Sequence, residues 1–287
     1  MGRNYQRNFG VRISKIKRKF NVRNISNVRD IGNVALDSVI YPLYAVIVKS
    51  PNKDAKKVFV SAGVHGDEPA GVYALLGFLE DKIERYLDDY SFVVLPCLNP
   101  TGFVRGSRFN ADCIDINRDF KEIAESKEAS YIKRLLRRQQ SNYAFAMDLH
   151  EDRTDKRTED IPIHKNPRGF YLYEVSYDRK TRRGHKIIDS MKNDGIRVYT
   201  DKKVYYCSNE NGLLWKPKLI HHKEGTIEEY VQRYAFNAFT TETPTCWPMK
   251  ERIHAQITAL CAALEEFKNV QYASGRYATA KARYATR

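Results

Sequence analysis

The sequence predicts an α/β fold, because short apolar runs of strand length alternate with longer segments in which apolar residues recur at helical spacing. The run 58–60 is β-branched and aromatic, as is typical of a buried strand. After Pro69 a helical stripe follows at Val72, Leu75, Leu76 and Leu79. Aromatic residues make up 12% of the 287 residues, which argues against disorder. A chain of this length can form one large α/β domain or two smaller ones.

The first part of the chain predicts a basic arm, a strand pair, further strands and a loop. Residues 1–23 carry Lys and Arg spaced among Ile and Phe, and we expect a solvated arm rather than an amphipathic helix on an anionic surface. From 34 to 48 apolar residues alternate around Tyr41–Pro42, which predicts strands broken by a turn at that point. The apolar run 91–98 predicts another strand. Residues 99–120 contain glycine and three arginines without a helical stripe, so we expect a long surface loop.

The second part of the chain continues the alternation of helices and strands. A helix over about 122–140 is expected to pack one apolar face on the sheet. The other expected elements are strands at 144–149, 170–175 and 236–241, a short helix at 185–191 and a long helix at 249–267. The charge-dense stretch 151–169 is expected to be a loop, and 199–229 has the loop character of a segment that could wall a cleft.

Charge and composition exclude several classes of function. The 49 basic and 35 acidic residues leave a formal charge of +14, which attracts anions such as nucleic acid, acidic polysaccharide or an anionic membrane without identifying the fold. The sequence contains no Rossmann fingerprint, Walker loop, zinc finger or aromatic-basic RNA-binding pattern, so we expect no specific nucleic-acid partner. No window approaches the ~20 apolar residues of a membrane span.

Cysteine usage and the first residues indicate a compartment. The five cysteines are odd in number and lack C-x-x-C spacing, which predicts buried free thiols in a reducing environment. The basic start never reaches the roughly 7 to 15 apolar residues of a signal peptide. We therefore expect a cytoplasmic protein, with export by a route that uses no cleaved signal as the alternative.

His65 and Glu68 stand three residues apart in the turn between the strand at 58–60 and the helix after Pro69. In open α/β sheets ligands bind outside the carboxyl ends of the strands, so an imidazole and a carboxylate placed there can converge on one cation. A catalytic zinc takes three protein ligands and one open position, and two His with one Glu is a known set. A second histidine must then come from elsewhere. The alternative is an exposed loop that merely contains a histidine and an acid.

Other polar residues occupy similar positions after predicted strands. His150 directly follows the strand at 144–149, where a third ligand would be needed, although a structural histidine also suits this position. Glu242 follows the strand at 236–241, where an acid can serve as a general base or simply lie at the surface. Asn117 and Arg118 end the loop 99–120, and a guanidinium there can bind a carboxylate in a bidentate manner, the alternative being solvated arginines.

These motifs, taken in order, resemble those of the zinc carboxypeptidases (funnelins) and of their short bacterial branch near succinylglutamate desuccinylase and aspartoacylase, with the rapid encystment phenotype proteins as a related group. The H-x-x-E metal pair of the family matches His65 and Glu68, and its distant third ligand matches His150 in Asp-Leu-His. The late glutamate of the family matches Glu242 in Thr-Thr-Glu-Thr-Pro.

Two further family segments fall in the loop 99–120. The N-P-D-G and D-L-N-R segments match Asn-Pro-Thr-Gly at 99–102 and Asp-Ile-Asn-Arg at 115–118. The arginine that the family places nine residues before the Asn of the second segment is Arg108. The resemblance extends over about 34–267, and several separate motifs in one order are far more specific than a single H-x-x-E.

The resemblance implies a central mixed β-sheet with helices on both faces and the site at the strand ends. It implies a basic arm at 1–23, one catalytic domain at 24–267 and a basic tail at 268–287 that we expect to be disordered. One Zn²⁺ per chain would be held by His65, Glu68 and His150. Glu242 would act as general base, Arg108 would face the oxyanion, and the substrate's terminal carboxylate would be held by Asn117 and Arg118.

Three features of the resemblance leave the substrate open. The spacing from Glu68 to His150 is shorter than in digestive carboxypeptidases, so a peptidase acting on C-terminal bonds has an amidohydrolase of N-acyl amino acids or cell-wall peptides as its alternative. The specificity position of the family is Ile227, which favours apolar C-terminal residues, but the adjacent Glu228 would make the pocket acidic, and we lean toward release of C-terminal Lys or Arg. The position of the family's mobile tyrosine holds Ile220.

A third hypothesis, a cationic anion-binding protein with a vestigial site, is opposed by the presence of all three ligand types and of Glu242. The oligomeric state and the natural substrate are not specified by the sequence.

Overall fold

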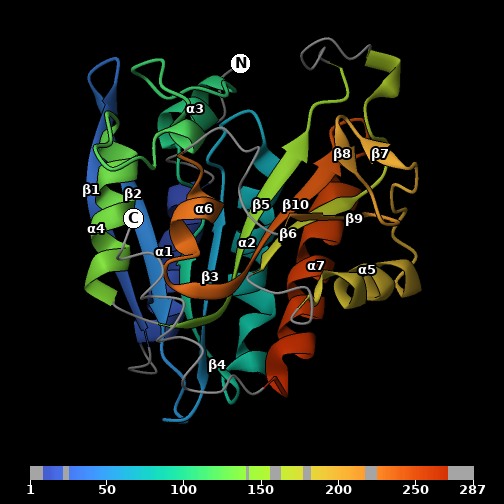
Figure 1. Cartoon of the computed structure of the whole chain (residues 1–287). Helices are drawn as coiled ribbons and strands as arrows, with labels where there is room; N and C mark the ends of the chain where they lie inside the picture. The colour runs from blue at the N-terminus through green and yellow to red at the C-terminus, as the bar shows by residue number, and fades with distance from the viewer. Residues whose placement is uncertain are drawn as a thin grey trace.

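The computed structural model describes residues 9–21, 26–139, 142–155, 163–176, 182–216 and 225–270. Its strands are β1 (Ser26–Leu36), β2 (Val39–Val48), β3 (Lys56–Ala62), β4 (Tyr90–Leu95), β5 (Tyr143–Asp152), β6 (Tyr171–Ser176), β7 (Lys203–Val204), β8 (Cys207–Ser208), β9 (Leu213–Lys216) and β10 (Ala235–Pro244). Eight of them form one mixed sheet in the order β1-β2-β4-β3-β5-β10-β6-β9, and β7 pairs separately with β8 (Figure 1).

Helices cover both faces of this sheet (Figure 1). The helices are α1 (Val11–Asn21), α2 (Pro69–Asp81), α3 (Pro100–Arg105), α4 (Lys127–Gln139), α5 (Gly184–Asn193), α6 (Ile227–Val231) and α7 (Met249–Lys268), with 3₁₀ turns η2 (Ile83–Tyr86), η3 (Ile116–Arg118) and η4 (Ile163–Lys165). One core cluster joins the sheet to α1, α2, α5 and α7, and a second joins its other face to α4 and α6. The predicted α/β class, with a mixed sheet covered on both faces, is confirmed.

Three parallel neighbours, β3, β5 and β10, form the centre of the sheet. Their carboxyl ends therefore meet at one edge, where Ala62 pairs with Leu149 and His150 pairs with Glu242. Because side chains alternate between faces along a strand, Asp148, His150 and Asp152 of β5 all lie on one face of the sheet. This register places the chemically active residues of distant segments side by side.

The turn from β3 into α2 depends on two glycines. Gly63 has a φ of +68°, a conformation that glycine adopts without steric cost. A Cβ on Gly66 would overlap the backbone of Gly102, so the turn packs directly against α3. Pro69 then opens α2 at a position where its missing N–H is not needed. The backbone is thereby fixed on both sides of His65.

The amino-terminal segment is not a solvated arm over the residues described, and that prediction is wrong. Helix α1 packs against α2, with Phe9, Ile13 and Ile16 buried. Arg12 donates two hydrogen bonds to the carboxylate of Glu80, at 2.8 and 2.6 Å. Most basic residues of this helix are exposed, while its apolar residues at three-four spacing are buried. The spacing of the apolar residues therefore determines how the helix packs on the domain.

The turn of the first strand pair is also displaced from its predicted place. Asp37 and Ser38 make the turn, both with positive φ, and Tyr41–Pro42 lies inside β2. Pro42 is tolerated there because β2 pairs with β4 only over Val46–Val48. The turn residues were not distinguished from the strand because neither of them is glycine.

Segment 99–120 is more ordered than a surface loop. It contains α3 and η3, and three of its asparagines are buried: Asn99, Asn110 and Asn117. The helix predicted from 122 begins later, at Lys127, because the Asp119 carboxylate accepts hydrogen bonds from the backbone N–H groups of Glu125 and Ser126. Strands β5 and β10 both continue beyond their predicted ends, so His150 and Glu242 lie within strands rather than after them.

Several predictions fall outside the described residues, including the tail beyond 270, the charge-dense loop over 156–162 and the position of Ile220. Among the residues that are described, none of the helices has the length and apolar character needed to cross a bilayer.

Candidate metal centre and active site

The structure brings His65, Glu68 and His150 together at the carboxyl edge of the central strands. One nitrogen or oxygen atom from each lies within 4.8 Å of the others, and all three side chains are buried. Nδ1 of His65 lies 2.7 Å from Oε1 of Glu68, and Nδ1 of His150 lies 2.8 Å from Oε2. The carboxylate of Glu68 therefore lies between two imidazoles, one from the turn after β3 and one from β5.

Each imidazole has a second carboxylate at its other nitrogen. Nε2 of His150 lies 2.7 Å from Oδ2 of Asp148, whose Oδ1 accepts a hydrogen bond of 2.7 Å from Ser61. Nε2 of His65 makes no well-aligned hydrogen bond within the described residues and faces Oδ1 of Asp115 at 3.3 Å. A carboxylate behind a histidine is the usual arrangement of a metal-ligating imidazole, because it holds the proton on the far nitrogen and leaves the near lone pair for the metal.

The contacts of His65 are better explained by a bound cation than by hydrogen bonds among the side chains alone. Its Nδ1 lies 3.3 Å from a guanidinium nitrogen of Arg108, which can only donate, and 2.7 Å from the carboxylate of Glu68, which as an anion can only accept. One ring nitrogen cannot accept from the first and donate to the second. A cation between Nδ1 and Glu68 removes the conflict, so two His and one Glu fit a metal ion, the set that catalytic zinc uses.

The charges of the cluster shift its pKa values strongly. Burial alone would raise the pKa of Glu68, but the two imidazoles outweigh it and hold that pKa well below its usual range. Burial opposes the charged form of His150, yet the carboxylates of Asp148 and Glu68 raise the pKa of His150 well above its usual value. The residues are therefore arranged to concentrate negative charge where a cation would lie.

Glu242 lies directly beside this cluster. It is the register partner of His150 on β5 and of Tyr171 on β6, so these three side chains share one face of the sheet. Burial raises the pKa of Glu242 well above its usual range, and the carboxylates of Glu68 and Asp152 raise it further. An acid with these surroundings is a candidate for proton transfer.

Arg108 reaches the same point from the segment after α3. Its Nε donates to Oδ2 of Asp115 at 2.9 Å, and its terminal nitrogen lies 4.0 Å from Oε1 of Glu68. About a third of its side chain remains exposed. The pKa of Asp115 lies below its usual range, because the nearby imidazole of His65 and the charges of Arg108 and Arg118 overcome its burial.

Asn117 and Arg118 follow Asp115 in η3, on the same side of the cluster as α6. The side-chain oxygen of Asn117 accepts a hydrogen bond of 2.9 Å from the backbone N–H of Ile227, which leaves its amide N–H₂ group for another partner. Arg118 donates to the backbone oxygen of Asn117 and is partly exposed. The two residues stand together, as a binding site for a carboxylate requires.

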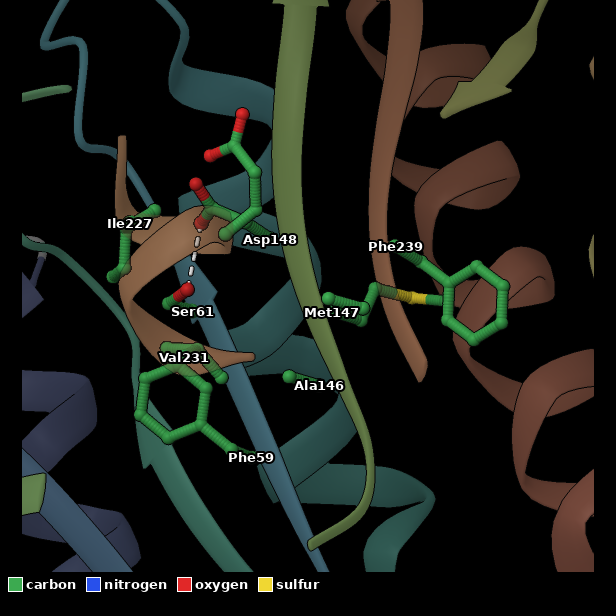
Figure 2. Close-up of a pocket in the computed structure, with 10 residues that line it drawn as sticks. Phe59, Ser61, Ala146, Met147, Asp148, Ile227, Val231 and Phe239 are labelled. Carbon is green, nitrogen blue, oxygen red and sulfur yellow. Dashed lines mark hydrogen bonds between the residues drawn. The ribbon is translucent and has the colours of Figure 1, made fainter. Parts of the chain in front are cut away.

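A small pocket lies between β3, β5, β10 and α6, and Asp148, the residue behind His150, lines it (Figure 2). Ile227 and Val231 line it from α6, and Phe59 lines it from β3. Figure 2 shows the Ser61–Asp148 hydrogen bond at its wall. Ile227 is only 1% exposed and belongs to the core cluster on the α6 face, so the predicted apolar position is a packed one.

Glu228 also lines this pocket and differs sharply from its neighbour. It is 8% exposed, and its Oε2 has no hydrogen-bond partner among the described residues. Burial raises its pKa, and the charge of Asp148 acts in the same direction, whereas His150 and Arg118 lower it. The desolvation of this buried carboxyl is thus uncompensated at one oxygen, and a positively charged group that reached it would offset that cost.

Two tyrosines that were not predicted as part of the site hold Asp152 beside it. Asp152 lies two residues beyond His150 on the same face of β5, and its oxygens accept hydrogen bonds from Tyr171 at 2.7 Å and from Tyr205 at 2.6 Å. Burial raises the pKa of Asp152 to about 6 against the effect of the two phenols. The alternation of Asp148, His150 and Asp152 along one strand was the sequence pattern that could have revealed it.

A second unpredicted group holds the strands from the opposite face. The side chain of Gln256 on α7 donates to the backbone oxygen of His150 at 2.6 Å and to Thr243 at 3.3 Å, and it accepts a hydrogen bond from Thr241. The carboxylate of Glu151 accepts from the backbone N–H of Ala70 at 2.6 Å and forms an ion pair with Arg252. The side chain of Glu151 therefore lies on the face of β5 opposite to His150, where its charge is paired with Arg252 and is not directed into the cleft.

The sequence profile of the succinylglutamate desuccinylase/aspartoacylase catalytic domain matches residues 54–267. The chain belongs to this family. The resemblance to the branch of zinc carboxypeptidase-like hydrolases near succinylglutamate desuccinylase and aspartoacylase is thereby confirmed.

The individual proteins that this chain resembles have low sequence identity to it or match only part of its length. Carboxypeptidase 2 of Trichophyton tonsurans is 32% identical over 110 residues, which is 36% of this chain and 20% of the relative, so the match spans about a fifth of that protein. A candidate metallopeptidase from Shewanella amazonensis has a TM-score of 0.74 at 22% identity, covering 92% of this chain and 93% of its own. A metallo-carboxypeptidase from Burkholderia cenocepacia has a TM-score of 0.62 at 16% identity, covering 91% and 68%. At these identities the structural likeness is one of fold.

Proposed function

We propose that the protein is a zinc-dependent metallocarboxypeptidase that hydrolyses the C-terminal bond of peptides, with a preference for C-terminal Lys or Arg. The observation that carries this proposal is the convergence of His65, Glu68 and His150 next to Glu242, which is aligned with His150 across β5 and β10. The names of the curated relatives, carboxypeptidase 2 and carboxypeptidase SOL1, support it.

The residues of the chain divide the reaction between them. A zinc ion held by His65, Glu68 and His150 would supply a Lewis acid that activates water and polarises the scissile carbonyl. Glu242 accepts the proton of the attacking water and passes it to the leaving amine. Arg108, whose guanidinium already faces the cluster, donates to the oxygen on which negative charge develops.

The remaining residues select and hold the substrate. Asn117 and Arg118 bind the terminal carboxylate, which a guanidinium and an amide can do with fixed geometry. The carboxylate of Glu228 pairs with the ammonium or guanidinium of the last residue. Because that buried carboxylate has an unused oxygen, its desolvation is offset only when a cationic side chain arrives, and this discriminates against apolar residues.

The test of this function combines a substrate panel with one variant. Peptides that differ only in a C-terminal Lys, Arg, Phe, Leu or Glu are compared by kcat/KM in the zinc-loaded wild type and in Glu228→Gln. We expect the Lys and Arg peptides to be cleaved at least tenfold faster than the Leu peptide by the wild type only. Glu229→Gln is the matched control, because the carboxylate of Glu229 bonds the N–H of Gly225 and does not line the pocket.

A stability measurement separates function from folding in this variant. An unpartnered buried carboxylate lowers the stability of the fold, so Glu228→Gln should keep or raise the Tm while it loses the Lys and Arg preference. If Phe or Leu is preferred by the wild type, or if Glu228→Gln leaves the ranking unchanged, the acidic pocket is refuted and the apolar Ile227 sets the specificity.

The family match favours a second candidate, an amidohydrolase that releases the acyl group of N-acyl amino acids. The same metal ligands and Glu242 would serve it, with Arg118 binding the carboxylate of the amino acid. N-acetyl and N-succinyl amino acids, tested in parallel with the peptides, distinguish the two. Higher kcat/KM on the acyl amino acids would replace the peptidase by the deacylase.

A further inference from the structure

A groove lined by positively charged side chains lies next to the site, near the end of the sheet that β6 and β9 form. It is lined by Lys165, Arg168, Lys202, Lys203, Tyr205 and Tyr206. One wall is the segment around η4 that follows β5, and the other is the β7–β8 hairpin, which lies beyond the end of β10 in Figure 1. We call it the basic groove.

The charge of the basic groove is not neutralised by neighbouring acids. All four of its cationic side chains belong to exposed residues, and none forms a salt bridge within the described part of the chain. Asp201 is the single acid among the described residues that line the groove, and its carboxylate accepts a hydrogen bond of 3.0 Å from Tyr199. Tyr206, at 67% exposed, adds an uncovered aromatic face. The groove therefore fits a negatively charged chain with some apolar surface.

The walls of the basic groove are held in place before any ligand arrives. Asn209 donates to the backbone oxygens of Tyr199 at 3.0 Å and Asp201 at 2.8 Å, and the backbone N–H of Tyr199 donates to Phe170 at 2.9 Å. On the opposite wall Asn166 is buried and donates to the backbone oxygen of Arg153. A pre-formed site loses less conformational entropy on binding than a mobile one.

Tyr205 connects the basic groove to the candidate active site. Its hydroxyl donates to Asp152, which lies two residues beyond His150, and the other oxygen of Asp152 accepts from Tyr171, the register partner of Glu242. Tyr205 in the groove wall is thus connected through the single side chain of Asp152 to the strand that carries His150, where the scissile bond would lie.

The direction of the substrate follows from the order of the strands. Asn117 accepts a hydrogen bond from Ile227 of α6. Helix α6 lies to the left of β5 and β10 in Figure 1, whereas the β7–β8 hairpin lies to the right. A peptide whose terminal carboxylate is held on the α6 side and whose scissile bond lies beside His150 and Glu242 must leave the site across β10 and β6. That path leads to the basic groove.

We propose that the basic groove binds an acidic peptide segment on the amino-terminal side of the scissile bond, so that the preferred substrates carry Asp or Glu upstream of their last residues. This inference rests on the proposed peptidase function. It assigns the large positive charge of the chain a local role, because four exposed cations, which form no salt bridge with any described residue, stand where the substrate chain would pass.

The experiment uses two peptides that end in the same Ala-Lys and differ upstream, acetyl-Glu-Glu-Glu-Ala-Lys and acetyl-Gln-Gln-Gln-Ala-Lys. The triple variant Lys165→Gln, Lys202→Gln and Lys203→Gln should lose about tenfold in kcat/KM on the Glu peptide, mainly through KM, and less than about twofold on the Gln peptide. The advantage of the Glu peptide in the wild type should shrink between about 0.05 and 0.5 M salt, because salt screens exposed charges.

A matched control removes the same charge elsewhere. Lys49, Lys53 and Lys192 are exposed and do not line the groove, so their triple replacement by Gln lowers the net charge equally and should leave both peptides unaffected. If the control triple weakens the Glu peptide as much as the groove triple does, net charge and not the groove is responsible, and the inference is overturned. Equal cleavage of both peptides by the wild type also overturns it while the peptidase function stands.

A binding measurement keeps the two proposals distinguishable. Fluorescence anisotropy of a labelled hexaglutamate peptide should show weaker binding to the groove triple than to the wild type and the control triple. Groove-dependent binding without cleavage of any peptide refutes the peptidase and supports the acidic-peptide groove. If a single-stranded oligonucleotide of matched charge binds the groove as tightly as hexaglutamate, the assignment to acidic peptides is wrong.

Discussion

Replacement of Asp148 by asparagine tests whether the carboxylate behind His150 supports a metal ligand. Asp148 is 3% exposed, and its two oxygens lie 2.7 Å from Nε2 of His150 and 2.7 Å from the hydroxyl of Ser61. Asparagine has nearly the same shape and can still accept from Nε2, while the hydroxyl of Ser61 rotates to accept from the new N–H₂ group. The fold should therefore persist, but the negative charge that makes the imidazole a stronger ligand is lost.

The expected effect is a loss of about 10-fold to 100-fold in zinc affinity, which corresponds to about 1.4 to 2.8 kcal/mol. It is measured by competition with a chelator of known affinity, with circular dichroism confirming that the variant is folded. Ser61→Ala keeps the carboxylate and should have a smaller effect, and Asp189→Asn on the exposed face of α5 should have none. Zinc affinity within about twofold of the wild type in the folded Asp148→Asn protein would refute the role of this carboxylate.

Three further predictions address the base, the strand clamp and a buried acid. Glu242→Gln should bind zinc as the wild type does but lower kcat by about 10²-fold to 10⁴-fold, since an amide cannot accept the proton, and a near wild-type kcat would exclude Glu242 as the base. Gln256→Leu leaves the carbonyl of His150 and two threonine hydroxyls without their partner, so it should lower the free energy of unfolding by about 2 to 4 kcal/mol in urea titrations, and a loss under about 0.5 kcal/mol would contradict the clamp. Burial raises the pKa of Glu128, so the folded state holds its proton more tightly than the unfolded chain and stability falls as pH rises through the window above the unfolded value of about 4.3. Glu128→Gln should therefore gain stability relative to the wild type between about pH 4 and pH 7, and an unchanged difference at the two pH values would contradict this sign.

Three of the residues that the sequence identified, His65, His150 and Glu242, lie near the carboxyl ends of buried strands. His65 lies in the turn after β3, while His150 and Glu242 lie in the last residues of β5 and β10, whose apolar character is clear in the sequence. Local patterns placed each residue near a strand end but left structural alternatives open, and the resemblance to the family joined the three segments into one site. The strand order of the structure explains why they meet, because β3, β5 and β10 are parallel neighbours whose carboxyl ends lie at one edge of the sheet.

The parts of the site that were missed depend on elements without local patterns. Tyr205 sits in a hairpin of two-residue strands with a φ of +51°, and its contact with Asp152 joins residues 53 positions apart. Gln256 reaches the backbone of His150 because α7 packs on the face of the sheet opposite to the His150 side chain. Neither relationship can be derived from periodicity, because it depends on which helix covers which face.

The small pocket beside α6 shows the same limit of prediction from sequence, here in the choice between two adjacent residues. Ile227 and Glu228 are adjacent in the first turn of α6, where successive side chains point about 100° apart, so a choice between them is a choice of helix orientation. That orientation is set by Thr226, whose side chain caps the helix, and by the hydrogen bond from the N–H of Ile227 to Asn117. Together they turn Ile227 into the core cluster with Phe59 and leave the carboxyl of Glu228 in the field of His150 and Arg118. In the proposed function an apolar residue at this position does not make the pocket apolar, because the cap of a five-residue helix determines which side chain the substrate would meet.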